Sequence, residues 1–80
     1  MFFVYIIYSE SLKKYYVGHT NNFERRLYEH NSGQTVYSSR GIPWVLIYKE
    51  EKTDRSEATR LESKIKKRGI ARYLKGIGVA

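Results

Sequence analysis

The chain has 80 residues, 15 Lys and Arg against 8 Asp and Glu (net charge +7), and no cysteine. Its length predicts a single domain over 1–80, with a core at about 2–75. The absence of cysteine excludes disulfides, thiolate metal sites and cysteine nucleophiles, and fits a cytoplasmic location. The longest apolar run, 2–8, is too short to cross a membrane, whereas the positive charge predicts a polyanionic partner, most commonly nucleic acid.

The first half of the chain predicts two strands and a helix. The uninterrupted apolar and β-branched run 2–8 predicts a strand that is buried on both faces. After a short polar loop, 15–18 predicts a second, antiparallel strand that ends at its glycine. Asn21 then predicts a helix N-cap, because Glu24 three residues later completes a capping-box pattern. We expect Gly33 to close this helix in the left-handed conformation.

The middle of the chain predicts a loop followed by a third strand. Residues 34–43 are polar and rich in serine, and they end at the single proline. The apolar run 44–48 predicts the strand, and the charged residues 49–52 are expected to leave it as a solvated segment.

The last third predicts two helices. Asp54 is the expected N-cap of the first, with Glu57 as its reciprocal partner, and Gly69 is its expected end. Its apolar stripe predicts packing on the sheet: Ala58, Leu61 and Ile65. A short helix is expected at 70–75 and a frayed end at 76–80. The order ββαβα, plus the short C-terminal helix, predicts an α+β domain whose three-stranded sheet is covered by helices.

Five polar side chains are candidates for a reaction site. Tyr5 and Tyr16 lie on the two strands that the predicted hairpin pairs. Arg26 and His30 are four residues apart on the first helix and share one side of it. Glu62 is a lone carboxylate in a basic stretch, and it suits Mg²⁺ or Mn²⁺. Each residue alone also fits a structural role, such as a strand tyrosine or a surface ion pair.

Together these groups are the parts of a site that cleaves phosphodiesters. Hydrolysis requires an activated water, a cation that stabilises the transition state, and assistance to the leaving oxygen. A phenol, an imidazole, a guanidinium and a metal-binding carboxylate provide this chemistry.

Two tyrosine motifs, at 4–6 and 16–18, resemble the signature of the GIY-YIG nuclease superfamily. Segment 20–33 is similar to the first helix of that family, with its arginine and histidine at the expected spacing. Two later stretches resemble the small single-domain bacterial proteins of the UPF0213 type: 39–44 and 62–67. The resemblance covers about 2–75, almost the whole chain.

The resemblance implies a central three-stranded antiparallel sheet flanked by helices, and cleavage of DNA with one divalent metal ion, Mg²⁺ or Mn²⁺. By position, Glu62 would be the metal ligand, and Tyr5 and Tyr16 would flank the scissile phosphate. Arg26 would stabilise the developing charge, and His30 would assist proton transfer or hold a tyrosine. Which tyrosine acts as the base stays open.

Three neighbouring positions complete the comparison with the family. Val4 stands where the family signature has glycine, and we expect no loss of chemistry because the tyrosine is kept. Gly18 would let the backbone pass close to the site, and the unmatched His19 is expected to be peripheral.

Well-characterised family members carry separate DNA-binding domains, for which this chain has no room. Substrate binding is therefore expected on the basic surface of the domain itself: Arg25, Arg40, Lys64, Lys66, Lys67, Arg68, Arg72 and Lys75. Contacts of this kind reach phosphates, so the binding would be sensitive to salt and would read little sequence.

Three functions are compatible with these residues and with the resemblance. The first is a metal-dependent DNA endonuclease directed by the structure of its substrate, or by damage, rather than by sequence. The second is a nucleic-acid-binding module that turns over slowly or not at all. The third is a nuclease domain that needs a protein partner for targeting. The choice of DNA or RNA stays open, as does that of a monomer or a weak dimer.

Overall fold

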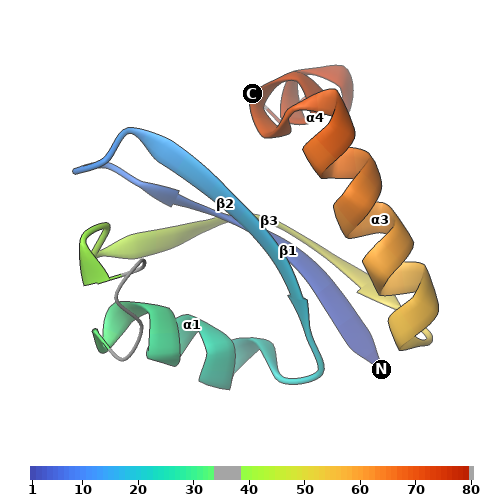
Figure 1. The fold of residues 1–80 in the computed structure, drawn as a ribbon, viewed down its shortest axis with the longest axis horizontal. Helices are drawn as coiled ribbons and strands as arrows, with labels where there is room; N and C mark the ends of the chain where they lie inside the picture. Colours follow the sequence, from blue (N-terminus) through green and yellow to red (C-terminus); the bar gives the residue numbers. More distant parts are fainter. Residues whose placement is uncertain (34–38, 80) are drawn as a thin grey trace.

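The computed structural model describes residues 1–33 and 39–79. They form three strands and three helices, in the order β1 (Phe2–Ser9), β2 (Lys14–Thr20), α1 (Phe23–Asn31), β3 (Trp44–Lys52), α3 (Arg55–Arg68) and α4 (Ile70–Gly76). The sheet has the order β2-β1-β3 and is antiparallel throughout. Helix α1 lies on one side of the sheet, and α3 and α4 lie on the other (Figure 1). The predicted α+β fold is confirmed.

Strand β1 is the centre of the molecule because both of its faces are apolar. Val4 and Ile6 are fully buried toward α3 and α4, in one core with the following residues: Val17, Ala58, Ile65, Tyr73 and Leu74. Tyr5 and Ile7 point to the other face, where they form a second core with Phe23 and Trp44. The alternation of side chains along a strand therefore supplies two cores from one segment, as its apolar run predicted.

Strands β2 and β3 both run further than their sequences predicted. β2 continues through Gly18, which pairs with Tyr5, and ends only at Thr20. β3 includes the charged residues 49–52, which pair with the first half of β1 instead of leaving the sheet. Charged side chains are well suited to this strand, since it forms an edge of the sheet. A register shift in the pairing of β1 with β3 falls between Ile6 and Ile7.

Helix α1 begins one residue later than predicted. The N-cap is Asn22, whose side-chain oxygen accepts a hydrogen bond from the Arg25 backbone N–H at 3.1 Å. The Asn22 N–H in turn donates to the hydroxyl oxygen of Thr20 at 3.1 Å, and this bond holds Asn22 in place as the N-cap. The prediction of Asn21 was therefore wrong. At the other end, Gly33 has φ +80°, as a residue that closes a helix requires.

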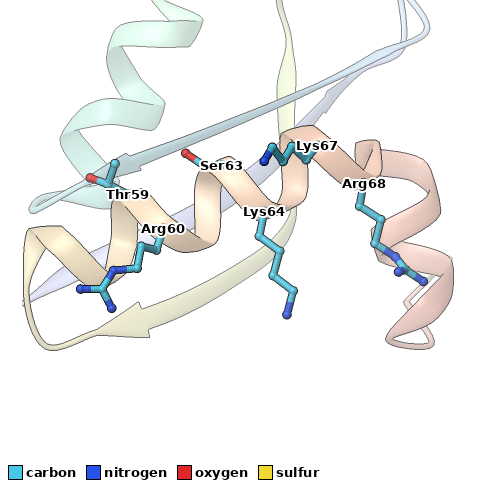
Figure 2. Close-up of a pocket in the computed structure, with 6 residues that line it drawn as sticks. All are labelled: Thr59, Arg60, Ser63, Lys64, Lys67 and Arg68. Atoms are coloured by element: carbon cyan, nitrogen blue, oxygen red, sulfur yellow. The ribbon is translucent and has the colours of Figure 1, made fainter.

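Helices α3 and α4 follow their predicted boundaries closely. Asp54 caps α3 by accepting from the Glu57 N–H at 2.9 Å, but the Glu57 carboxylate accepts from Thr53 instead of reciprocating. Gly69, at φ +96°, ends α3 and begins α4. The chain after Gly76 stays attached to α4 as far as Val79, whose N–H donates to the Leu74 carbonyl oxygen at 2.9 Å. The fraying expected from Gly76 onward is therefore not seen in these residues. The outward side of α3 is strongly basic (Figure 2).

The connection from α1 to β3 is fixed at both of its ends. The amide of Asn31 accepts from the Trp44 N–H at 2.6 Å and donates to the Trp44 carbonyl at 3.2 Å. This pair of bonds holds the start of β3 against the end of α1, beside His30. Much of the loop expected at 34–43 lies outside the described residues. No helix in the described part of the chain is long and apolar enough to cross a membrane.

The position of the α1 cap gives a direct test of this local structure. Asn22→Ala removes the acceptor for the Arg25 N–H and should lower the free energy of unfolding by about 1 kcal/mol. Asn21→Ala is the matched control and should change it by less than about 0.5 kcal/mol, because Asn21 caps nothing. Urea unfolding followed by circular dichroism measures both, and a larger loss for Asn21→Ala would contradict the assignment.

Candidate active site

The β1–β2 hairpin brings two phenol rings together on the α1 side of the sheet. Tyr5 pairs with Gly18, and Ile7 pairs with Tyr16, so that the two tyrosines lie diagonally across one face. Their ring centroids are 6.3 Å apart, with an angle of 30° between the planes. A Cβ atom on Gly18 would lie 2.7 Å from the Tyr5 hydroxyl oxygen. The glycine therefore provides the space in which the phenol lies.

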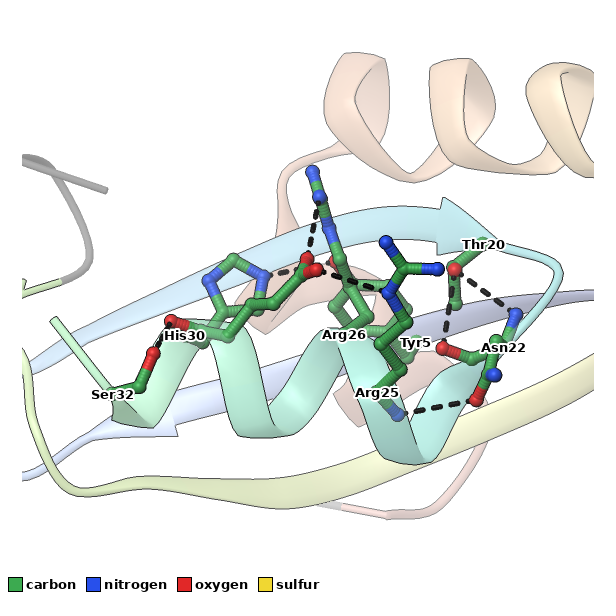
Figure 3. Close-up of polar contacts among 8 residues, drawn as sticks. Tyr5, Thr20, Asn22, Arg25, Arg26, His30 and Ser32 are labelled. Atoms are coloured by element: carbon green, nitrogen blue, oxygen red, sulfur yellow. Dashed lines mark hydrogen bonds and ion pairs between the residues drawn. The ribbon is translucent and has the colours of Figure 1, made fainter. Parts of the chain in front are cut away.

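Helix α1 places an imidazole against both tyrosines. His30 Nε2 lies 3.0 Å from the Tyr5 hydroxyl oxygen (Figure 3). The His30 ring packs edge-on against Tyr16, with a centroid distance of 4.9 Å. Tyr5 and His30 are only 1% and 5% exposed, so their hydrogen bond is shielded from water. Tyr16 is half-buried and forms the outer side of this cluster.

Burial makes the hydrogen bond between Tyr5 and His30 a neutral one. Burial lowers the pKa of His30, and the positive charge of Arg26 lowers this pKa further. Burial also raises the pKa of Tyr5 to about 12, although contact with Arg26 opposes this shift. At neutral pH the phenol therefore keeps its proton and the imidazole is uncharged. The Tyr5 O–H donates, and His30 Nε2 accepts.

Two arginines of α1 share one carboxylate. Glu29 accepts from Arg26 Nη1 through one oxygen and from Arg25 Nε through the other, both at 3.2 Å. Contact with Tyr5 raises the pKa of Arg26, which stays charged, and 43% of its side chain is exposed. The Arg26 Nε is buried without a hydrogen-bond partner among the described residues. A surface hollow of about 250 Å³ is lined by these groups and the start of α1: Thr20, Asn21, Asn22, Arg25, Arg26 and Glu29.

Sequence reasoning had not identified Glu29 as part of the site. The available signal was its spacing, because Glu29 follows Arg25 by four residues and Arg26 by three on a predicted helix. Side chains at both spacings lie on one helix face and form ion pairs.

Helix α3 supplies the carboxylate of Glu62 from the other side of the sheet. One Glu62 oxygen lies 2.5 Å from His19 Nδ1, and the other lies 2.8 Å from Lys66 Nζ. Burial opposes ionisation, but the hydrogen bonds from Lys66 and His19 outweigh it and lower the pKa of Glu62. The group is thus a carboxylate at neutral pH, with 16% of its side chain exposed.

The expectation that His19 is peripheral was wrong. β2 extends past Gly18, so His19 is a strand residue and not part of a turn. It pairs with Val4, whose side chain belongs to the core on the α3 side of the sheet. Cross-strand partners point to the same face, and this directs His19 at Glu62.

The groups on the two sides of the sheet interact electrostatically around β2. The charge of Glu62 contributes to the raised pKa of Tyr5. The Tyr16 phenol contributes, less than Glu62 does, to the raised pKa of Lys66. β2 is an edge strand. The structure therefore places the five candidate residues on the two sides of the β1–β2 hairpin, with Tyr5, Tyr16, Arg26 and His30 on the α1 side and Glu62 on the α3 side. His19, Glu29 and Lys66 are added neighbours.

The donor set around Glu62 fits a hydrated magnesium-type ion better than a protein-enclosed one. Among the described residues, no three His, Cys, Asp or Glu side chains form a metal-binding group. A carboxylate offers about four acceptor positions, of which His19 and Lys66 use two. Mg²⁺ is commonly held by one or two carboxylates while it keeps several waters and takes phosphate oxygens of the substrate.

The basic residues expected to bind nucleic acid come from several elements of the fold. Arg25 and Lys66 are paired with Glu29 and Glu62 beside the site. The remaining six are exposed before β3 and on the adjoining helices α3 and α4: Arg40; Lys64, Lys67 and Arg68; Arg72 and Lys75. Their assignment to nucleic-acid binding stays a prediction.

The neutral state of His30 predicts that the protein becomes less stable as the pH is lowered. In the unfolded chain a histidine takes up its proton near about pH 6.5, whereas burial keeps the folded-state pKa of His30 below that value. As pH falls through this window the unfolded state binds more protons, and the free energy of unfolding decreases. Urea titrations from neutral to mildly acidic pH should show a smaller decrease for His30→Gln than for the wild type. An equal decrease in both would contradict a neutral buried His30.

Comparisons with known proteins identify the family of this chain. A sequence model of the GIY-YIG catalytic domain matches residues 1–73. The UPF0213 protein SH2523 of Staphylococcus haemolyticus is 38% identical over 65 residues, which cover 80% of this chain and 78% of that protein. The UPF0213 protein DP2720 of Desulfotalea psychrophila is 41% identical over 66 residues, which cover 80% of this chain and 59% of that protein.

The whole described fold is also similar to a solved structure. The solution NMR structure of the UPF0213 protein BH0048 from Bacillus halodurans matches with a TM-score of 0.60 at 26% identity. The match covers 99% of this chain and 85% of that one. The chain belongs to the GIY-YIG catalytic domain family and is related within it to the UPF0213 proteins.

Proposed function

We propose that the protein is a metal-dependent DNA endonuclease, directed by the structure of its substrate or by damage rather than by sequence. The observation that supports this most is the gathering of an ionised carboxylate, a charged guanidinium and two phenols around one edge strand. Glu62 and Arg26 keep their charges at neutral pH, and both are partly exposed. The family match makes nuclease chemistry the expected use of such a set.

The burial of the candidate residues suggests a division of roles. Tyr5 and His30 are too deeply buried to touch a substrate in this conformation. Their hydrogen bond instead positions the neighbouring groups, because it fixes α1, and with it Arg26, against the sheet. Tyr16 is half-buried, and we assign it as the phenol that reaches the substrate. In this proposal Tyr16, and not Tyr5, is the phenol that acts on the attacking water.

The proposed reaction is an ordinary hydrolysis of a phosphodiester. The oxygen of a water molecule bonds to phosphorus, and the bond from phosphorus to the leaving sugar oxygen breaks. The water loses one proton and the leaving oxygen gains one. Tyr16 orients the water through a hydrogen bond, and Arg26 donates to a phosphate oxygen whose negative charge increases in the transition state.

Glu62 is the group proposed to hold a divalent metal ion. When bound there, Mg²⁺ or Mn²⁺ would act as a Lewis acid on a phosphate oxygen and would lower the pKa of a bound water. His19 and Lys66 hold the two carboxylate oxygens in a fixed orientation. Lys66 reaches Glu62 from a 60% exposed position, whereas His19 is held in the sheet.

Removal of the carboxylate tests the reaction separately from binding. Glu62→Ala should reduce nicking of supercoiled plasmid with Mg²⁺ or Mn²⁺ by at least about a hundredfold, and it should leave DNA affinity largely intact. Glu51→Ala, on the exposed side of β3, is the matched control and should cut like the wild type. Cleavage that survives Glu62→Ala would refute the site. Binding without cleavage by the wild type would favour a binding module or a missing partner.

Removal of one hydroxyl tests the assignment of the tyrosines. Tyr16→Phe keeps the ring packing and should lower the cleavage rate about tenfold to a hundredfold, because the water loses an orienting hydrogen bond. Tyr8→Phe removes a hydroxyl from the neighbouring Tyr8–Tyr15 ring pair and should leave the rate unchanged. Rates are measured under single-turnover conditions. An unchanged rate for Tyr16→Phe would return Tyr16 to a structural role.

A further inference from the structure

The outward face of α3 carries exposed cations for which the proposed reaction has no use: Arg60, Lys64, Lys67 and Arg68. With two small polar residues they line a shallow surface hollow of about 660 Å³ (Figure 2). Three of the cations follow one another at intervals of four residues and project to the same side of the helix. We call Arg60, Lys64 and Arg68 the outer row. Its steps of about 6 Å along the helix axis are comparable with the spacing of consecutive phosphates on one strand.

The outer row has no ion-pair partner in the part of the chain that the structure describes, although Glu57 lies beside Arg60 and Lys64, and the charge of Lys64 helps to lower the pKa of Glu50. Among the residues that the structure describes, no carboxylate forms a salt bridge with Arg60, Lys64 or Arg68. The cations beside the reaction site differ, since Lys66 and Arg25 are each paired with a glutamate. Like charges four residues apart on a helix repel each other. A bound polyanion would relieve this repulsion.

The outer row faces away from the reaction site. Lys64 lies two residues from Glu62 and two from Lys66 on α3. Two residues correspond to a rotation of about 200° around the helix axis, so Lys64 projects from nearly the opposite side. The body of α3, about 10 Å across with its side chains, therefore separates the outer row from the catalytic carboxylate. A straight duplex seated at Glu62 cannot also lie along the outer row.

The composition of this face favours nucleic acid over a lipid surface. Helices that bind membranes insert an apolar face between the lipids. The apolar face of α3 is buried in the core through Ala58 and Ile65, and the hollow on its outward face is lined by cations with Thr59 and Ser63. Long, unpaired cations in a row are what a phosphate backbone requires.

We propose that the outer row is a second DNA site, which binds the backbone of a duplex arm other than the arm held at the reaction site. This inference rests on the proposed function, because it assumes that DNA occupies the catalytic side. It explains how so small a domain selects its substrate. Only a branched or sharply bent DNA presents two backbone segments to opposite sides of α3, and two linked contacts strengthen each other.

The test compares affinity for two DNA probes. One is a four-way junction, and the other is a linear duplex of about one helical turn. Lys64→Gln/Arg68→Gln removes two charges of the outer row. Lys13→Gln/Lys14→Gln removes two exposed charges at the start of β2 and is the matched control. Fluorescence anisotropy without divalent metal, between about 50 and 200 mM salt, gives the affinities and their salt dependence.

We expect the wild type to bind the junction more tightly than the duplex. Lys64→Gln/Arg68→Gln should weaken junction binding about fivefold or more and should reduce the slope of log affinity against log salt by nearly two. Binding of the linear duplex should fall by no more than about twofold, since the catalytic side still holds it. The control variant should keep the preference of the wild type.

Three results would overturn the proposal. An equal loss on both probes would place the outer row on the path of one continuous duplex. No loss on either probe would make it an ordinary solvated face. Loss of binding to anionic vesicles, with junction binding unchanged, would make it a membrane contact. A wild type that binds junctions but cuts no DNA would refute the proposed function alone, because the anisotropy measurement requires no cleavage.

Discussion

The hydrogen bond between the Tyr5 hydroxyl and His30 Nε2 is the interaction on which the arrangement of the site depends. It joins the central strand to α1 inside a core of aromatic rings, where an unpaired polar group would be costly. Gly18 leaves the space that the phenol occupies, and the neighbouring Asn31 ties the end of α1 to β3. Arg26, one turn before His30, is thereby held at the surface of the same layer.

The distribution of charge follows from this arrangement. Around the reaction site the described basic side chains are paired with carboxylates: Glu29 binds Arg25 and Arg26, and Glu62 binds His19 and Lys66. These pairs fix the orientation of the groups proposed to meet the scissile phosphate. The outward face of α3 has no such pairs among the described residues, and its cations remain available to a polyanion. The domain thus separates groups that would act on a phosphate from groups that would hold one.

Much of the fold could be predicted from the sequence, whereas several contacts of the site could not. The apolar run of β1 and the cap at Asp54 are local signals, and both are confirmed. The α1 cap was misassigned because Asn21 and Asn22 are adjacent, and the choice between them depends on the Thr20 hydroxyl, which accepts from the Asn22 N–H. The contact of His19 with Glu62 joins residues 43 positions apart, and it depends on the pairing register of β2, which sequence periodicity does not fix.

The protonation and tautomeric state of His30 is the property to measure first, by ¹⁵N NMR on the 80-residue protein at neutral pH. We predict a neutral ring with its proton on Nδ1, whose Nε2 accepts a hydrogen bond from Tyr5. That state should change on Tyr5→Phe substitution. An imidazolium, or a ring that carries its proton on Nε2, would contradict this assignment, because the buried hydrogen bond would then have a different donor. The proposed division of roles between Tyr5 and Tyr16 would then lose its basis.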